Sequence, residues 1–242
     1  MVLELGVADK VKQLRREGLR PAEKLVAQIL RAGDAAFRPL LELATDTALL
    51  HEDEPECYAP LHALRLLSEL GSLDMIEPVL RCYPLELEYE DERLPQVWAE
   101  EAPQLIGHLG APAIAPLWAI ADDTTWAPAA RSSALRALTY VTAVAPELRA
   151  PIITGLRERL AAANDSTLAA FLIAALSSLG VAALYSELMA LYRTGKVDTE
   201  IIPAGAMRQL LLSDSTKRLA CALHPLWERY DQHGPFAKER EA

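Results

Sequence analysis

The sequence predicts an all-α fold, an α-α superhelix of about five helical pairs with capping helices. Five times, at spacings of 39, 38, 35 and 36 residues, two adjacent apolar residues follow one marked position. These marked positions are Pro39, Pro78, Pro116, Pro151 and Glu187. A period of this size is typical of helical pairs that stack into a solenoid. Composition agrees, because 51% of the residues are apolar but only three are Phe, which suits helices packed through Ala and Leu.

The turn inside each pair is predicted at a small residue, because glycine readily adopts the positive φ that ends many helices. These turn residues are Gly33, Gly71, Gly110, Ala145 and Gly180. The marked prolines follow six or seven residues later. Since proline is tolerated in the first turn of a helix but not deep inside it, the second helix of each pair should begin shortly before its proline.

One continuous solenoid is expected over residues 1–230. Its pairs are predicted at about 21–53, 57–84, 95–122, 126–163 and 166–194. Residues 3–18 should form a capping helix, and residues 199–230 a C-terminal cap of two helices, 201–212 and 215–230, the second bent at Pro225. Leu61, Leu64 and Leu67 illustrate the apolar spacing of three and four that buries one helix face. Residues 231–242 lack this period and are expected to be a frayed tail.

The uncharged stretch 166–186 is long enough to be weighed as a membrane span, for which about twenty apolar residues suffice. Ser177, Ser178 and Gly180 lie at the predicted turn of the last pair, so two buried half-helices explain it better. The N-terminus carries no apolar segment of the secretory type. A cytoplasmic protein without membrane contact is therefore expected.

The formal charge of −10 is concentrated in one part of the chain. From Leu41 to Trp126 there are three basic residues, Arg65, Arg81 and Arg93, against eighteen acidic ones. Many of these acids fall in loops between the predicted pairs. Equivalent loops project from the same edge of a solenoid, so eleven carboxylates should form one acidic ridge. The ridge residues are Glu52, Asp53, Glu54, Glu56, Glu86, Glu88, Glu90, Asp91, Glu92, Asp122 and Asp123.

The acidic ridge has three interpretations. It can be a solvated edge that keeps an apolar chain soluble, which is the usual role of a charge run. It can bind a partner protein with a basic surface. A calcium site is the third interpretation, but no loop has the Asp-x-Asp-x-Asp-Gly spacing that wraps the ion.

The sequence gives little support for a bound cofactor or metal ion. Cys57, Cys82 and Cys221 form no Cys-x-x-Cys, and no two histidines have metal-ligand spacing. His62 and Cys57 are five residues apart and do not share a helix face, so a packed histidine is expected there and not a thiol site. We find no phosphate loop, no Gly-x-Ser-x-Gly and no nucleotide fingerprint. No cofactor and no metal are expected.

The segment Ala115–Asp123 followed by Ala130–Leu138 resembles a HEAT repeat of the short bacterial type. In such repeats a proline opens the second helix, acidic residues end it, and an arginine followed by small residues starts the next pair. The resemblance covers about residues 21–212 and implies a HEAT-like solenoid.

More narrowly, Tyr58–Leu67 and the late Gly195–Asp198 with Ile201 and Ile202 resemble an uncharacterised bacterial HEAT-like family. Some members of that family end in a cysteine-rich SEC-C zinc motif. This chain lacks the cysteine cluster. The resemblance therefore implies no zinc-dependent function.

HEAT-like folds also include DNA glycosylases, so Trp98, Trp118, Trp126 and Asp122 could be placed around a lesion. The strongly acidic middle of the chain opposes this, because it would repel the phosphate backbone. The sequence therefore favours a non-enzymatic protein that binds another protein, through the second helices or through the acidic ridge. The alternative is an enzyme on the same scaffold, a base-excision glycosylase or a small-molecule lyase.

The alignment of the first two pairs also predicts contacts. Arg38 and Glu42 lie one before and three after Pro39, and Glu77 and Arg81 occupy the same positions around Pro78. Equivalent positions on stacked helices lie next to each other. Arg38 is therefore expected to pair with Glu77, and Glu42 with Arg81.

Overall fold

The structure is a computed structural model that describes residues 6–83 and 93–231. In these ranges it has fourteen α-helices and eight short 3-10 helices, and no strand. The prediction of an all-α fold is confirmed. The chain forms two compact units, unit 1 from Met1–Leu109 with His224–Ala242, and unit 2 from Gly110–Leu223.

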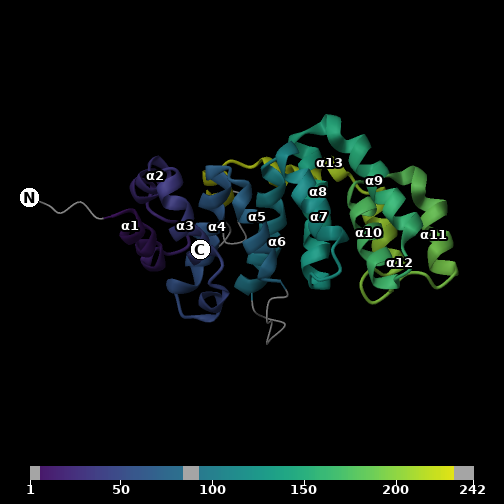
Figure 1. Ribbon diagram of the computed structural model, residues 1–242, viewed down its shortest axis with the longest axis horizontal. Helices are drawn as coiled ribbons and strands as arrows, with labels where there is room; N and C mark the ends of the chain where they lie inside the picture. The colour runs from purple at the N-terminus through teal and green to yellow at the C-terminus, as the bar shows by residue number, and fades with distance from the viewer. Residues whose placement is uncertain (1–5, 84–92, 232–242) are drawn as a thin grey trace, which may run out of the picture. The chain divides into compact units, whose positions relative to one another are not determined.

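Unit 1 contains the helices from both ends of the described chain. They are α1 (Val7–Gln13), η1 (Leu14–Arg16), α2 (Glu23–Arg31), α3 (Asp34–Ala44), η2 (Thr47–His51), η3 (Glu56–Tyr58), α4 (Ala59–Leu70), η4 (Leu73–Met75), α5 (Ile76–Arg81), α6 (Arg93–His108) and α14 (Leu226–Asp231). Helix α3 packs against α1 and α4, α4 packs against α6, and α14 packs against α4. Figure 1 shows α1 to α4 following one another in chain order.

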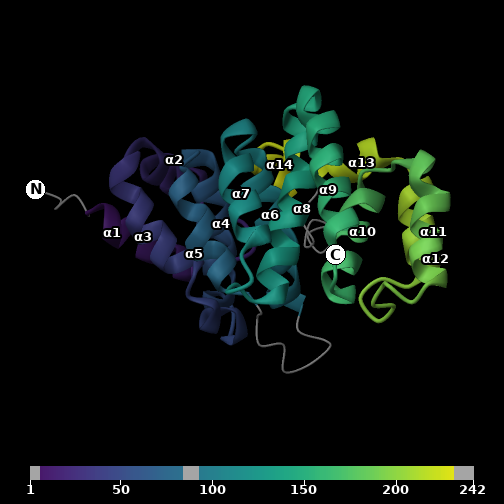
Figure 2. The same cartoon turned by 45° about the vertical axis from the view of Figure 1, so that its right-hand side comes forward.

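Unit 2 contains the remaining helices. They are η5 (Ala111–Ala113), α7 (Ile114–Asp122), α8 (Pro128–Val144), η6 (Pro146–Leu148), α9 (Arg149–Ala162), α10 (Ser166–Ser178), η7 (Ala182–Leu184), α11 (Tyr185–Arg193), α12 (Ala204–Leu212), α13 (Ser215–Leu219) and η8 (Ala220–Leu223). Helix α8 packs against α7, α9 and α10, and α10 packs against α9 and α12. Figures 1 and 2 both show α9, α10 and α12 side by side.

One order of elements recurs at four of the five predicted second helices. A 3-10 helix leads directly into an α-helix in η4–α5, η5–α7, η6–α9 and η7–α11. The predicted turn glycines precede the recurring elements, and Gly71, Gly110 and Gly180 have φ of 70°, 73° and 68°. Gly33 also has a positive φ, of 55°. Side chains other than glycine rarely adopt this region, which explains the residue choice.

The marked prolines lie where the second helices begin. Pro78, Pro116 and Pro151 are each the third residue of their α-helix, α5, α7 and α9. Pro39 differs, because it is the sixth residue of α3 and lies inside it. No 3-10 helix precedes α3, so this helix begins earlier relative to its proline than the other three.

The predicted apolar faces form the cores. Leu64 and Leu67 of α4 are fully buried in unit 1, as are Leu138 and Val141 of α8 in unit 2. Within the described residues no single helix has the length and apolar composition to cross a membrane; Arg93–His108 and Ala111–Asp122 meet that criterion only as a bent pair taken together. The stretch 166–186 is split at Gly180, as predicted.

The C-terminal cap differs from the prediction. The expected helix 215–230 is three elements, α13, η8 and α14, and Pro225, which lacks an N–H, interrupts the helix between η8 and α14. Helix α14 belongs to unit 1 instead of closing the array. Asp231, expected in the frayed tail, is the last residue of α14, and residues 232–242 lie outside the described ranges. A single continuous solenoid over 1–230 stays a prediction.

The expected ion pairs between the first two pairs of helices were wrong. The Arg38 Nε donates to Glu42 Oε1 at 3.1 Å, within α3. The Arg81 guanidinium donates to Glu77 Oε1 at 3.1 Å, within α5. Residues four apart lie on the same helix face and can pair whatever the alignment of neighbouring helices. The pair within each helix therefore forms instead of the pair between helices.

Candidate functional site

The first acidic residues of the predicted ridge lie between η2 and η3 in unit 1. Glu52, Asp53 and Glu54 are exposed. The Tyr58 hydroxyl donates to Glu54 Oε1 at 2.6 Å, and Arg15 donates to Glu56 Oε2 at 2.5 Å. Part of the charge in this loop is therefore already compensated.

The rest of the predicted ridge is divided between an undescribed segment and unit 2. Glu86, Glu88, Glu90, Asp91 and Glu92 lie outside the described residues. Asp122 and Asp123 lie at the end of α7, in unit 2, and both are exposed. One continuous ridge therefore stays a prediction.

Asp122 is engaged by an arginine that the sequence analysis did not connect with it. Arg159 of α9 donates from Nε and a terminal nitrogen to the two Asp122 oxygens, at 2.7 and 2.6 Å. The same guanidinium lies over the Trp118 ring, 3.8 Å from its centroid. Bidentate geometry and stacking together fix the position of Arg159 more firmly than an isolated surface pair would.

Arg159 and Asp122 line a cavity of about 430 Å³ in unit 2. Six of its ten lining residues are Ala or Leu, and the four polar ones are Asp122, Arg159, Asn164 and Asp165. Leu135, Leu168 and Leu172 form its apolar part. An apolar cavity with a few polar groups is the usual form of a ligand-binding site, so this cavity is the candidate functional site of unit 2.

The polar groups of the cavity are held by the ends of helices. Asp165 is the N-cap of α10, and its two oxygens accept from the backbone N–H of Thr167 at 3.2 Å and of Leu168 at 3.1 Å. Arg131 of α8 donates to the Ala121 carbonyl at 2.9 Å and so caps the end of α7. These bonds satisfy helix ends that would otherwise lack partners.

A second polar group is buried in unit 1. Arg65 of α4 and Glu101 of α6 form a bidentate ion pair; the Arg65 Nε lies 2.7 Å from Glu101 Oε2, and a terminal nitrogen donates to Oε1. The Arg65 guanidinium also lies over the Tyr230 ring, 4.4 Å from its centroid. Burial opposes the charge of Arg65, but the Glu101 carboxylate outweighs it and raises the pKa of this side chain.

His62 connects the same group to the start of the chain. One ring nitrogen, Nε2, lies 2.9 Å from the Gly18 carbonyl, and the other, Nδ1, lies 2.9 Å from the Tyr230 hydroxyl. A carbonyl only accepts, so Nε2 carries the proton and Nδ1 accepts from Tyr230. Burial lowers the pKa of His62 to about 3 and raises the pKa of Tyr230 to about 12, which keeps both side chains neutral.

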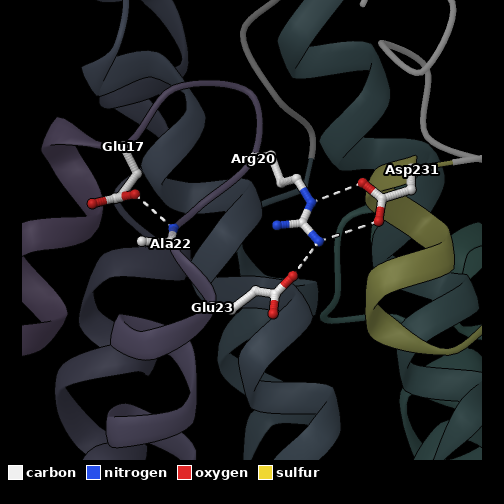
Figure 3. Close-up of polar contacts among 5 residues, drawn as sticks. All are labelled: Glu17, Arg20, Ala22, Glu23 and Asp231. Carbon is white, nitrogen blue, oxygen red and sulfur yellow. Dashed lines mark hydrogen bonds and ion pairs between the residues drawn. The ribbon is translucent and has the colours of Figure 1, made fainter.

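At the edge of this group, Arg20 joins α14 to α2. It donates from Nε to Asp231 Oδ1 at 2.8 Å and from a terminal nitrogen to Glu23 Oε1 at 2.7 Å (Figure 3). The Arg20 guanidinium lies over the Trp227 ring, 4.5 Å from its centroid. Together, Arg20, Arg65 and His62 hold the C-terminal helix on the N-terminal part of unit 1.

The group in unit 1 is structural. Both ring nitrogens of His62 are occupied, and His62 and Tyr230 are buried, so neither can reach a substrate. The same bonds leave no imidazole for a thiol site with Cys57, and burial raises the pKa of the Cys57 thiol. No group of three or more His, Cys, Asp or Glu suited to a metal ion occurs among the described residues.

The burial of His62 makes the stability of unit 1 depend on pH. The pKa of His62 is lowered in the folded chain, so only the unfolded chain takes up this proton near pH 6.5. The contribution of neutral His62 to the free energy of unfolding is therefore complete above that pH and is lost as the pH falls toward 3. We expect a loss of about 2 kcal/mol in the free energy of unfolding between pH 7 and pH 5.

Urea titrations at several pH values would measure this slope. His62→Gln, whose amide can both donate and accept, should flatten it. His51→Gln, which replaces an exposed histidine, is the matched control for the loss of one imidazole, and the slope should flatten more in His62→Gln than in this control. Equal slopes for the wild type and His62→Gln would contradict the assignment.

The tryptophans weighed for a glycosylase are divided between the units, Trp98 in unit 1 and Trp118 and Trp126 in unit 2. Trp98 is fully buried, and its Nε1 donates to the Ala44 carbonyl at 3.1 Å. Trp126 is buried as well, and Trp118 is covered by Arg159. Their positions favour roles in packing.

Sequence reasoning missed the Arg65–Glu101 pair, the Arg159–Asp122 pair and the return of α14. For the two ion pairs, the sequence contained a signal that could have found them. Their residues are separated by 36 and 37 positions, close to the repeat spacing found in the sequence. Nothing comparable marks α14, because its partners lie more than 100 residues away, as in the His62–Tyr230 bond. Comparison of the chain with known protein families and with curated proteins gave no match.

Proposed function

We propose that this chain is a non-enzymatic, HEAT-like helical-repeat protein that binds another protein with a basic surface in the cytoplasm. The observation that carries the proposal is that the polar groups described above are bonded within the chain. His62 bonds to Tyr230 in unit 1, and Asp122 bonds to Arg159 in unit 2. Exposed acidic loops and an apolar cavity are then the features through which it can act.

The repeat architecture is supported by contacts one period apart. Arg65 bonds to Glu101 over 36 residues, and the Ser68 hydroxyl bonds to the Leu105 carbonyl over 37. In unit 2, Arg159 reaches Asp122 over 37. These separations match the sequence period of 35 to 39 residues, as expected when equivalent positions of neighbouring pairs pack together.

The charge of the chain supports a basic partner. Its formal net charge is −10, and the exposed Glu52 and Asp53 are in a loop. Carboxylates on a surface attract a basic partner over distance and act mainly on the association rate. Such attraction is screened as salt rises, because the Debye length is about 10 Å at 0.1 M.

Capture with the immobilised full chain from its native cells, followed by mass spectrometry, would supply partner candidates. Each candidate is then purified and its association measured between about 50 and 500 mM salt, which shortens the Debye length several-fold. We expect the association rate of the true partner to fall roughly tenfold or more over this range, as electrostatically steered encounters do. A purified partner that associates at the same rate at all salt concentrations would contradict the electrostatic part of the proposal.

Charge reversal tests the acidic ridge directly. Glu88→Lys, Glu90→Lys and Glu92→Lys together should slow association and remove most of its salt dependence. Lysine at the exposed Glu147, Glu158 and Glu200, none of which belongs to the predicted ridge, changes the net charge equally and is the matched control. If both triple variants slow association equally, net charge alone acts and the ridge is a solubilising edge. If no purified protein binds the chain, protein binding itself is refuted.

A further inference from the structure

The cavity of unit 2 has the size and lining of a ligand site. Its volume of about 430 Å³ falls within the range of about 300 to 1,000 Å³ typical of such sites. The polar side, formed by Asp122, Arg159, Asn164 and Asp165, will be called the rim, and all of its members except Arg159 are exposed. A ligand would place an apolar group against the leucines and a polar group at the rim.

The two features of the rim that could attract an anion, Arg159 and the start of α10, already bond to carboxylates. Arg159 uses three of its five N–H donors, two on the oxygens of Asp122 and one on the Gly155 carbonyl at 3.1 Å. The first N–H groups of α10 bond to Asp165. A bound anion would lie beside the carboxylates of Asp122 and Asp165, so an anionic ligand is disfavoured.

A cationic ligand, in contrast, can still bond to the carboxylates of the rim. Each carboxylate oxygen has two lone pairs, so Asp122 and Asp165 can still accept hydrogen bonds. The lining carries two carboxylates against the single guanidinium of Arg159. Asp123 follows Asp122 in the chain, and Arg131 bonds to the carbonyl of Ala121 in the lining, so these two opposite charges offset each other and one excess negative charge remains. The rim therefore complements a single positive charge.

We propose that this cavity is the docking point for a basic peptide segment of the partner. An apolar side chain of that segment fills the cavity, and a neighbouring lysine or arginine bonds to Asp122 or Asp165. The inference rests on the proposed protein-binding function and names the chemistry of the segment. A peptide fits because the rim is open to solvent along the loop between α9 and α10, so a chain can enter and leave.

Three synthetic peptides test the chemistry on the full chain labelled with ¹³C at its Leu and Ala methyl groups. They are acetylated, amidated hexapeptides of sequence GKLFKG, GELFEG and GKSSKG. We expect GKLFKG to shift the methyl signals of Leu135, Leu168 and Leu172 and to bind roughly tenfold or more tightly than the other two, a difference of about 1.4 kcal/mol. Equal binding of GELFEG would refute the charge argument, and equal binding of GKSSKG the apolar one.

Two variants locate the site. Asp165→Ser removes the charge but keeps an N-cap, because serine caps helices about as well as aspartate. Asp214→Ser makes the same change at the N-cap of α13, which does not line the cavity, and is the matched control. We expect Asp165→Ser to weaken GKLFKG binding several-fold and Asp214→Ser to leave it unchanged. Equal effects of the two would overturn the assignment.

Ala162→Trp, on an exposed position of the lining, should fill the cavity and abolish GKLFKG binding with unchanged helix content by circular dichroism. The same variants separate this inference from the proposed function. If a purified partner binds the wild type, Asp165→Ser and Ala162→Trp equally, the cavity assignment falls and protein binding stands. If GKLFKG binds as expected but no purified protein does, the ligand chemistry of the cavity stands, while protein binding falls and with it the role of the cavity as a docking point for a partner.

Discussion

Glu101→Ala should lower the free energy of unfolding of unit 1 by about 3 to 5 kcal/mol, the usual effect of removing one partner of a buried ion pair. Arg65 is only 2% exposed, and Glu101 supplies both of its carboxylate contacts. Without Glu101, the guanidinium stays charged in a site that water does not reach. Tyr230 offers its ring face, which does not replace a carboxylate.

Chemical denaturation would measure this loss. Trp98 and Trp227 are the tryptophans of unit 1, so a background with Trp118→Phe and Trp126→Phe limits the fluorescence signal to that unit.

The control is the double variant Arg65→Met with Glu101→Leu. It removes both charges and keeps apolar volume, and such replacements are often neutral or stabilising. We expect it to recover most of the stability that Glu101→Ala loses. If the double variant is as unstable as the single one, the loss comes from packing volume and not from the unpaired charge.

Ending the chain at Leu223 should destabilise unit 1 and leave unit 2 folded. The truncation removes Tyr230, which is 3% exposed, and removing a buried aromatic side chain alone costs about 3 to 5 kcal/mol. It also leaves Nδ1 of His62 without its hydroxyl partner and uncovers Arg65. We expect amide hydrogen exchange to accelerate in α4 and α6 while α8 and α10 stay protected.

Two further variants show which part of the removed segment stabilises unit 1. A chain ending at Asp231 keeps α14 and separates its contribution from that of residues 232–242. Tyr230→Phe keeps the ring over Arg65 but removes the hydroxyl, and an unsatisfied buried group costs about 1 to 3 kcal/mol. Unchanged exchange in α4 and α6 after truncation at Leu223 would show that α14 contributes nothing to unit 1.

The parts of the fold that local chemistry determines could be predicted from the sequence. Gly71, Gly110 and Gly180 mark turns because their positive φ is strained in other residues. Pro78, Pro116 and Pro151 mark helix starts because proline is readily tolerated only in the first turn of a helix. Each signal acts within a few residues, so one sequence is enough to find it.

The parts that depend on distant partners were missed. A charge in an apolar helix, such as Arg65, has no local partner, and its pairing with Glu101 follows only from the repeat register. The expected bond between Arg38 and Glu77 used the same register but failed, because Glu42 was available on the same helix. The repeat register therefore corresponds to a real pair where no local partner competes, as with Arg65 and Glu101, although this pair was not predicted. For the candidate site, Asp122 was named, while Arg159 and the apolar lining were not.

The construction of unit 1 from both ends of the chain has a consequence for synthesis. The bond between Arg20 and Asp231 joins residues 211 positions apart, and all of unit 2 lies between them. At about 5 to 20 residues per second, the ribosome needs roughly ten seconds to pass from the end of α6 to α14. During that interval Gly110–Leu223 emerges with every residue it needs, whereas Arg65 and His62 still wait for Tyr230. The part of the protein that is made first is therefore the last to be completed.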